Sequence, residues 1–341
     1  MMKKFFFVFM AVCIVSAFII SLTPEVHAQA IQLTYSNFFP PTHVQSQLAD
    51  YWCKEVEIRT NGRVKIKYYP GGTLTKANEC YEGVVKGKSD LGFSMLAYSQ
   101  GRFPVMGAVD LPLGYTSGKV ATAVANEIYR QFKPKELSDT EVMYLHALGP
   151  NLIATRGKAV RRLEEMRGLR IRVPGISSEL VVKNLGAIPV PKPMPEYYQL
   201  VKSGQLNGCV HPLETMKGWK LAEVENYVTA SYPIASTSTF FVVMNKAKWN
   251  SLPKDIQTII KAINNEWIPQ HGEAWDTTDR EGMLFFLNHG GQMIGLNSQE
   301  AARWKKAVAP LIDDYVKFLD GQGLNGRKVI DAAIGTLDSM Q

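Results

Sequence analysis

The stretch 167-RGLRIRVPGISSE-179 has the pattern of a strand that leads directly into a helix. Its apolar residues alternate with Arg170 and Arg172, which is the two-residue period of a strand with one buried face. The Val-Pro-Gly sequence ends the strand, and Ser177 and Ser178 are suited to cap the helix that follows. The stretch therefore predicts a strand–helix unit with Arg172 at the strand end, where it is either a ligand-binding cation or a solvated residue.

The same order of elements, strand–helix–strand–helix–strand, occurs twice along the chain. Such βαβαβ units are typical of parallel α/β sheets, and glycines end the predicted helices. The two units share no clear residue identity, so they indicate a similar architecture rather than a repeated sequence. We expect the elements of the first unit at residues 31–36, 44–60, 64–69, 75–87 and 90–95, and those of the second at 169–173, 177–185, 187–191, 195–204 and 206–210.

Two α/β units predict two lobes with a ligand cleft between them. We expect lobe I to comprise residues 29–150 and about 237–285, and lobe II to comprise 151–236 and about 286–341, with the C-terminal helices. In open parallel sheets, ligands bind beyond the carboxyl ends of the strands. The residues at or just beyond the predicted strand ends include Phe38, Phe39, Tyr98, Arg172, Met194 and His211.

The chain begins with 1-MMKKFFFVFMAVCIVSAFII-20, in which two lysines precede an unbroken apolar run. Together with the small-residue site 26-VHA-28, this order is typical of a secretory signal peptide, so we expect cleavage after Ala28. An uncleaved membrane anchor is the alternative. No second apolar run of spanning length follows, so we expect the mature protein to be exported.

The charge of the chain is mildly positive. The formal net charge is +7 and becomes +6 without residues 1–28, which contain two lysines and one glutamate. Basic residues are dispersed, with no dense basic block beside stacked aromatic residues, so nucleic-acid binding has no support. The positive excess is compatible with an anionic ligand.

The sequence carries no recognised catalytic or metal-binding pattern. Its six histidines include no H-E-x-x-H pair, and G-x-S-x-G and G-x-G-x-x-G are absent. The spacing of zinc ligands is also missing. We therefore expect no enzyme, no cofactor and no metal. His211 and Trp219 are each compatible with packing or with ligand contact.

Three cysteines follow residue 28, namely Cys53, Cys80 and Cys209. An exported chain enters an oxidising compartment, where disulfides form. Cys53 and Cys80 fall in the predicted helices 44–60 and 75–87, and adjacent helices on one face of a sheet can bring cysteines within bridging distance. We expect a Cys53–Cys80 disulfide, with two buried thiols as the alternative, and a free, buried Cys209.

A series of motifs is spread along the chain after residue 28. They are 40-PPTH-43, 61-NGRVKIKYYPGGTL-74, 83-GVVKGKSDLGFS-94, 168-GLRIRVPG-175, 185-LGAIPVP-191, 196-EYYQLVKSGQLNG-208, 217-KGWKLAEVENYVT-229 and 245-NKAKWNSLPKDIQ-257. In this order they resemble the substrate-binding proteins of the tripartite ATP-independent periplasmic (TRAP) transporters. The resemblance implies a two-lobed periplasmic binding protein fold that closes over a small organic acid. The loaded receptor then delivers the acid to a membrane permease driven by an ion gradient.

The resemblance also implies roles for individual residues. In that family the second Arg of a G-L-[KR]-[IL]-R-V strand binds the solute carboxylate, which assigns this role to Arg172. It places His211 where an Asn often contacts ligand, and Met194 where an aromatic residue is frequent. Many members carry a further Arg near the position of Asn151, so its absence favours a monocarboxylate with an apolar or aromatic body. The residues that suit such a body are Phe38, Phe39, Tyr98 and Met194, and Trp219 is a further ligand-binding candidate.

Two other functions are compatible with the same fold. One is a sensory binding protein that presents its ligand to a signalling partner. The other is a secreted enzyme, since a fold does not determine a function. The missing nucleophile–base pattern disfavours the enzyme, and we expect a periplasmic receptor.

Overall fold

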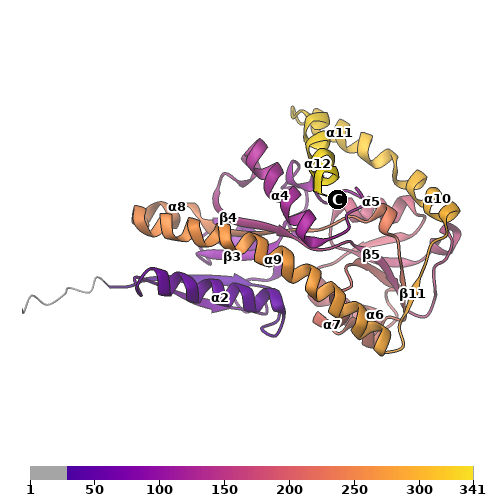
Figure 1. Cartoon of the computed structure of the whole chain (residues 1–341), viewed down its shortest axis with the longest axis horizontal. Coiled ribbons are helices and arrows are strands. Elements are labelled where there is room, and N and C mark those ends of the chain that lie inside the picture. Colours follow the sequence, from indigo (N-terminus) through magenta and orange to yellow (C-terminus); the bar gives the residue numbers. More distant parts are fainter. Residues whose placement is uncertain (1–28, 341) are drawn as a thin grey trace, which may run out of the picture.

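The computed structural model describes residues 29–340, and the expected signal peptide lies outside them. Within this range the strands form two sheets, and each sheet is the centre of one α/β lobe (Figure 1). The two-lobed α/β fold expected from the sequence is confirmed. Both predicted βαβαβ units are present, one in each sheet.

The sheet of lobe I has the strand order β2-β1-β3-β10-β4. β1 lies parallel to both β2 and β3, whereas β10 is antiparallel to its two neighbours. The chain therefore leaves lobe I after β4 and returns from lobe II to insert β10 into the sheet. The strands are β1 (Ile31–Asn37), β2 (Val64–Tyr69), β3 (Leu91–Met95), β4 (Thr140–Ala147) and β10 (Thr239–Asn245).

The sheet of lobe II has the strand order β11-β9-β5-β8-β6-β7. β6 lies parallel to β7 and β8, as the βαβαβ pattern predicts, and β5 is antiparallel to β8 and β9. The strands are β5 (Leu152–Thr155), β6 (Arg170–Val173), β7 (Ile188–Pro191), β8 (Gly208–His211), β9 (Tyr227–Thr229) and β11 (Gln292–Ile294).

Helices cover both faces of each sheet. The helix after β6 begins at Ile176 with Gly175 as its N-cap, so the expected capping by Ser177 and Ser178 is wrong. The chain turns immediately after Pro174, which leaves both serines inside the first helical turn. The helices are α2 (Val44–Arg59), α3 (Cys80–Val85), α4 (Gly118–Phe132), α5 (Ile176–Asn184), α6 (Met194–Lys202), α7 (Thr215–Gly218), α8 (Lys246–Ser251), α9 (Lys254–Asn288), α10 (Ser298–Val308), α11 (Pro310–Gly321) and α12 (Gly326–Met340).

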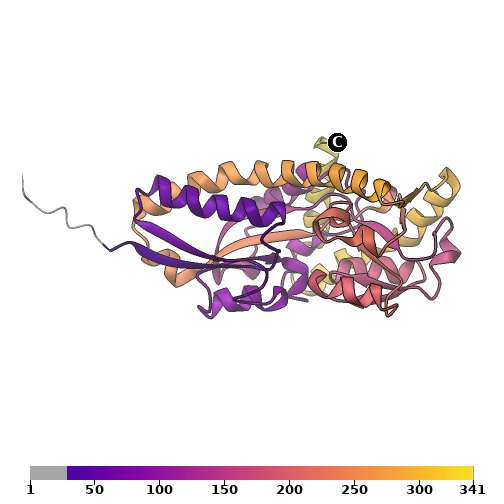
Figure 2. The same cartoon turned by 90° about the horizontal axis from the view of Figure 1, so that it is seen from below.

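The long helix α9 belongs to both lobes. Its 35 residues run along the length of the molecule, beside α2 at one end and toward α6 and α7 at the other (Figures 1 and 2). It packs on α2, α4 and β4 in lobe I and on α7 in lobe II. A single continuous helix thus connects the two halves of the cleft.

The C-terminal helices divide between the lobes. Trp304 and Val308 of α10 pack in the core of lobe II, whereas Leu319 of α11 and Leu337 of α12 join the core of lobe I. The expectation that all C-terminal helices belong to lobe II is therefore corrected. The apolar face of α12 packs on α4, so the last described helix lies on lobe I (Figure 1).

The expected Cys53–Cys80 disulfide is wrong, because both cysteines are free, buried thiols. Cys53 packs in the core on one face of the lobe I sheet, and Cys80 packs in the core on the other face. The strand order β2-β1-β3 explains this arrangement, because the chain moves in opposite directions in its first two crossovers. Right-handed crossovers then place α2 and α3 on opposite faces of the sheet.

We predict that the mature protein contains three unreactive thiols in its native state. Burial raises the pKa of Cys80 and of Cys209 to about 12 and raises that of Cys53 as well, so little thiolate forms at neutral pH. A chain beginning at Gln29 should show almost no reaction with Ellman's reagent when folded. It should show three thiols when denatured without reductant. Fewer than three would contradict the free-thiol structure.

Candidate functional site

A small pocket lies between the lobes, beyond the carboxyl ends of the central parallel strands, and is called the ligand pocket below. Its walls leave about 20 Å³ of free volume, which is room for about one water molecule. The residues that line it are Phe38, Phe39, Met95, Tyr98, Leu148, Asn151, Arg172, Pro174, Met194, Val210, His211, Pro212, Glu214, Thr215, Trp219, Ser238 and Phe240.

Arg172 lies at the end of β6 with its side chain 1% exposed. Its Nε donates to the carbonyl of Lys192 at 2.7 Å, and its Nη1 lies 3.6 Å from Sγ of Cys209. Among residues 29–340, no carboxylate lies within ion-pair distance of this guanidinium. A buried charge without a counter-ion is costly, so the pocket favours an anion beside Arg172.

Tyr98 connects Arg172 to the opposite lobe. Its hydroxyl oxygen accepts a hydrogen bond from Nη2 of Arg172 at 3.1 Å and from the backbone N–H of Met194 at 3.0 Å. Because both contacts use the oxygen as acceptor, the phenol hydrogen remains available to donate. In the described chain it has no acceptor, so Tyr98 offers a hydrogen bond to a bound anion.

His211 is held by protein groups on both ring nitrogens. Its Nε2 bonds Oε2 of Glu225 at 2.8 Å, while Nδ1 lies 2.6 Å from the Thr215 hydroxyl and 2.8 Å from the Pro212 carbonyl. Glu225 also accepts from the Tyr197 hydroxyl and is 1% exposed. His211 therefore lines the pocket without a free nitrogen, and it presents its ring rather than an N–H to a ligand.

Asn151 closes the pocket where the chain passes between the lobes. Its side-chain nitrogen donates to the hydroxyls of Ser236 and Ser238, both at 3.2 Å. Its backbone N–H donates to the Ser236 carbonyl at 2.9 Å. The amide oxygen is not used by these bonds, so Asn151 contributes an acceptor rather than a cation.

Aromatic rings form the remaining wall of the ligand pocket. Phe38 of lobe I stacks on Trp219 of lobe II, with ring centroids 6.2 Å apart and planes 18° apart. The edge of Tyr98 faces Phe38 at 5.7 Å. An apolar or aromatic ligand body placed here would contact rings from both lobes.

All eight ligand-binding candidates from the sequence line this one pocket. They are Phe38, Phe39, Tyr98, Asn151, Arg172, Met194, His211 and Trp219. The sequence reasoning missed Ser238 and Phe240, although both follow directly on residue 237, where the chain is expected to return to lobe I. It also missed Glu214 and Thr215, which follow the strand end at His211 and carried no distinguishing pattern.

A hydrogen bond joins the lobes beside the pocket. Nδ1 of His43 accepts from the backbone N–H of Gln45 at the start of α2, so the ring hydrogen is on Nε2. Nε2 donates to Oε2 of Glu214 in lobe II at 3.0 Å, and the two side chains are 1% and 3% exposed. Separating the lobes would break this contact, so it stabilises the closed arrangement.

A second, larger cavity lies next to the ligand pocket and is called the outer cavity below. It leaves about 220 Å³ of free volume and has walls from both lobes and from α11. Asp110 in its wall accepts from the Thr239 N–H at 2.9 Å and from the Thr239 hydroxyl at 2.7 Å. Burial raises the pKa of Asp110 from 3.8 to about 7. The residues that line the cavity are Leu96, Ala97, Ser99, Gln100, Gly101, Phe103, Pro104, Gly107, Asp110, Pro174, Gly175, Ile176, Ser177, Ser178, Leu180, Ser238, Asp314, Tyr315 and Phe318.

Neither a metal site nor a membrane span is present in the described part of the chain. No group of three His, Cys, Asp or Glu side chains within residues 29–340 is arranged to hold a metal ion. No helix in the same range is long and apolar enough to cross a membrane.

Two α/β lobes that enclose a pocket at their strand ends define a two-lobed solute-binding protein. Residues 35–317 match the family model of the bacterial extracellular solute-binding proteins, family 7 (DctP). Because this match spans most of the chain, the protein belongs to that family. The resemblance to TRAP receptors found in the sequence is confirmed.

Solved TRAP receptors share the whole fold. The chain is 30% identical to a TRAP periplasmic solute-binding protein from Desulfovibrio salexigens, with a TM-score of 0.79 over 91% of this chain and 96% of that chain. It is 25% identical to one from Rhodoferax ferrireducens in complex with copurified benzoate, with a TM-score of 0.85 over 91% and 98%. It is 26% identical to a marine metagenome protein specific for aromatic acid ligands, with a TM-score of 0.86 over 91% and 99%.

We predict that His43→Asn weakens ligand binding. Asn keeps the capping of α2, but it is too short to reach Glu214 and leaves that carboxylate buried without its partner in the closed form. A penalty of ~1–3 kcal/mol on closure corresponds to about five- to hundredfold weaker ligand binding in calorimetry.

The matched control for this variant is Lys217→Met. It removes the ion pair between Lys217 of α7 and Glu281 of α9, whose side chains are about half exposed. These two helices pack on each other in lobe II, so this pair does not hold the lobes together. Exposed pairs contribute little, so its affinity should stay within about twofold of wild type. Equal affinities for His43→Asn and wild type would show that the His43–Glu214 contact does not stabilise closure.

We predict that Asp110 makes folding less favourable as pH rises. Its folded pKa lies above the unfolded value of 3.8, so the folded state binds more protons between about pH 4 and pH 7. The free energy of unfolding therefore falls by about 4 kcal/mol across that window and stays at the lower value above it. Asp110→Asn keeps the Thr239 contacts without the charge, so its stability relative to wild type should grow from pH 5 to pH 8.

Urea unfolding at pH 5, 6, 7 and 8 measures this difference. The exposed Asp314→Asn in the same cavity is the control, and its difference from wild type should not change with pH in the same way. A constant difference between Asp110→Asn and wild type would contradict the prediction.

Proposed function

We propose that this protein is a periplasmic receptor that binds a small monocarboxylate with an apolar or aromatic body. It delivers this solute to a TRAP membrane permease driven by an ion gradient, and it catalyses no reaction. The observation that carries the proposal is the buried Arg172 guanidinium, which has no carboxylate partner in the described chain. A ligand carboxylate would supply the missing counter-ion.

The composition of the pocket supports one carboxylate rather than two. Arg172 is the only Lys or Arg among the described residues that line it, and the ring nitrogens of His211 already bond protein groups. Asn151 supplies an acceptor, which does not attract a second anionic group. A dicarboxylate would therefore leave one carboxylate desolvated without a cation.

The aromatic wall supports a ligand with an apolar body. Phe38 contacts Tyr98 within lobe I and Trp219 across the lobes, and a flat ring fits such surroundings by stacking or edge contacts. Two of the similar receptors carry aromatic acids, benzoate in one and metahydroxyphenylacetate in the other. Benzoate is therefore the probe that we choose for the experiments.

Binding by this pocket requires movement of the lobes. The closed walls leave about 20 Å³, so a ligand enters while the lobes are apart and becomes enclosed as they close. Arg172 and Trp219 come from one lobe, and Phe38 and Tyr98 come from the other. The ligand stabilises the closed state only to the extent that it contacts both sets.

Export of the protein to the periplasm is part of the same proposal. The family is extracellular, and an N-terminal segment with the pattern of a signal peptide fits export with cleavage after Ala28. A receptor that has closed over its solute in the periplasm meets the permease in its closed, loaded form.

We predict that Arg172→Lys weakens benzoate binding by about tenfold to a hundredfold. A guanidinium can meet a carboxylate with two parallel hydrogen bonds, and an ammonium cannot reproduce that geometry. Loss of one charged hydrogen bond costs ~1.5–3 kcal/mol. Isothermal titration calorimetry measures the change, and thermal unfolding checks that the variant is folded.

Arg170→Lys is the matched control, because Arg170 is exposed two residues earlier on the same strand. Its benzoate affinity should stay close to that of wild type. If Arg172→Lys also binds benzoate as wild type does, Arg172 is not the carboxylate-binding residue and the proposal fails.

A further inference from the structure

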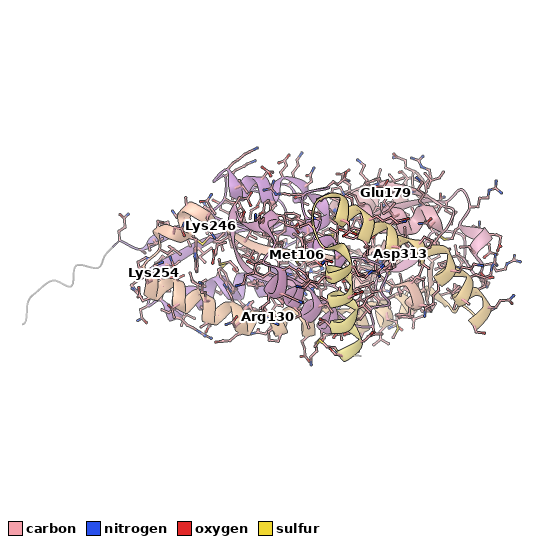
Figure 3. All side chains as sticks on the ribbon, turned by 90° about the horizontal axis from the view of Figure 1, so that it is seen from above. Met106, Arg130, Glu179, Lys246, Lys254 and Asp313 are labelled. Atoms are coloured by element: carbon pink, nitrogen blue, oxygen red, sulfur yellow. The ribbon has the colours of Figure 1, made fainter. Side chains whose placement is uncertain are left out.

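The outer cavity adjoins the ligand pocket along the junction of the lobes. Pro174 and Ser238 belong to the walls of both. The segment after β3 is shared in the same manner, because Tyr98 lines the ligand pocket while Ala97 and Ser99 line the outer cavity. Figure 3 locates the region by the labels of Met106 of lobe I, Glu179 of α5 and Asp313 of α11.

The partition between the two cavities is a contact between lobes. A Cβ atom built on Gly175 would lie 2.6 Å from Cβ of Ala97, so the backbone of lobe II touches lobe I at this point. Such a contact forms only when the lobes close. A small separation of the lobes therefore joins the ligand pocket to the outer cavity.

The walls of the outer cavity determine what it accepts. They are mostly apolar, with Phe103, Leu180 and Phe318 among them, and no Lys, Arg or His of the described chain takes part. Asp110 and Asp314 are the acidic groups, and neither supplies a positive charge to a carboxylate. A neutral, apolar group fits these surroundings and a second anionic group does not.

One polar group in this cavity has no partner. Ser178 is 3% exposed, and in the described chain its hydroxyl makes no hydrogen bond. Its Oγ is not fully buried and remains accessible from the cavity. A hydroxyl or carbonyl carried by a neutral ligand arm would satisfy it.

We propose that the outer cavity is a second subsite of the ligand-binding cleft, which receives the neutral arm of a monocarboxylate held at Arg172. This inference rests on the proposed receptor function and defines the ligand class more narrowly. The class is an arylalkanoate or a similar acid whose arm passes between Ala97 and Gly175. The arm prevents full contact of the lobes at that point and fills the outer cavity instead.

The experiment compares a homologous series of acids by calorimetry. The acids are benzoate, phenylacetate, 3-phenylpropionate, 4-phenylbutyrate and 5-phenylpentanoate. Once the ring passes the partition, each added methylene should strengthen binding by about fourfold, because burial of one methylene contributes ~0.8 kcal/mol. Octanedioate, which has a charged end, should bind at least tenfold more weakly than 5-phenylpentanoate.

Two variants test the location of the arm. Ser177→Trp places a large side chain at the outer cavity, and the affinity ratio of 5-phenylpentanoate to benzoate should fall at least tenfold. Glu179→Trp adds the same side chain to α5 outside the cavity lining, and the ratio should stay within twofold of wild type. Ser99→Trp fills the cavity from lobe I and should repeat the effect of Ser177→Trp.

The outcomes separate this inference from the receptor function. If Arg172→Lys weakens benzoate binding but affinity does not rise with arm length, the subsite is wrong and the receptor proposal stands. The subsite is also wrong if Ser177→Trp and Glu179→Trp give the same ratio, or if octanedioate binds more tightly than 5-phenylpentanoate. If no acid binds to the wild-type protein, both proposals fail.

Discussion

The hydrogen bond from the Arg172 guanidinium to the Tyr98 hydroxyl is the interaction on which the ligand pocket depends. It places a buried cation of lobe II against a phenol of lobe I, and the same phenol oxygen accepts the Met194 N–H. The Tyr98 hydroxyl and the Lys192 carbonyl are neutral acceptors, so they hold the guanidinium without neutralising its charge. The energetic cost of that unpaired charge is the reason that we propose an anionic ligand for this site.

Much of the fold was predictable, because its parallel strands and helices have clear periodicity. β4 and β5 were missed, since β5 is buried on both faces and β4 along most of its length, so neither alternates between apolar and polar residues. The amphipathic pattern of the last helices predicts helices but does not state which core they cover. The wrong prediction of a Cys53–Cys80 disulfide has a similar origin. The face of the sheet that a helix covers depends on the strand order, and the strand order cannot be predicted from local sequence.

The candidate site was more predictable than the contacts that support it. In open parallel sheets the carboxyl ends of the strands lie at one edge, which brings residues that are distant in sequence close together. For this reason all eight candidates line one pocket. The pair of His43 and Glu214 joins residues 171 positions apart, and no local pattern links them. The role of His211 also changed once Glu225 and Thr215 were seen to bond its ring nitrogens.

The continuity of α9 has a mechanical consequence for the protein. A helix of 35 residues is about 50 Å long, and its axial hydrogen bonds make it stiff compared with a loop. Because its two ends are packed in different lobes, opening the molecule must bend or twist this rod. Pro269, near its middle, lacks an N–H and removes one of those bonds, which makes that turn the most compliant part of the rod. In the proposed opening of the lobes, the stiffness of the helix at Pro269 would therefore contribute to the opening angle.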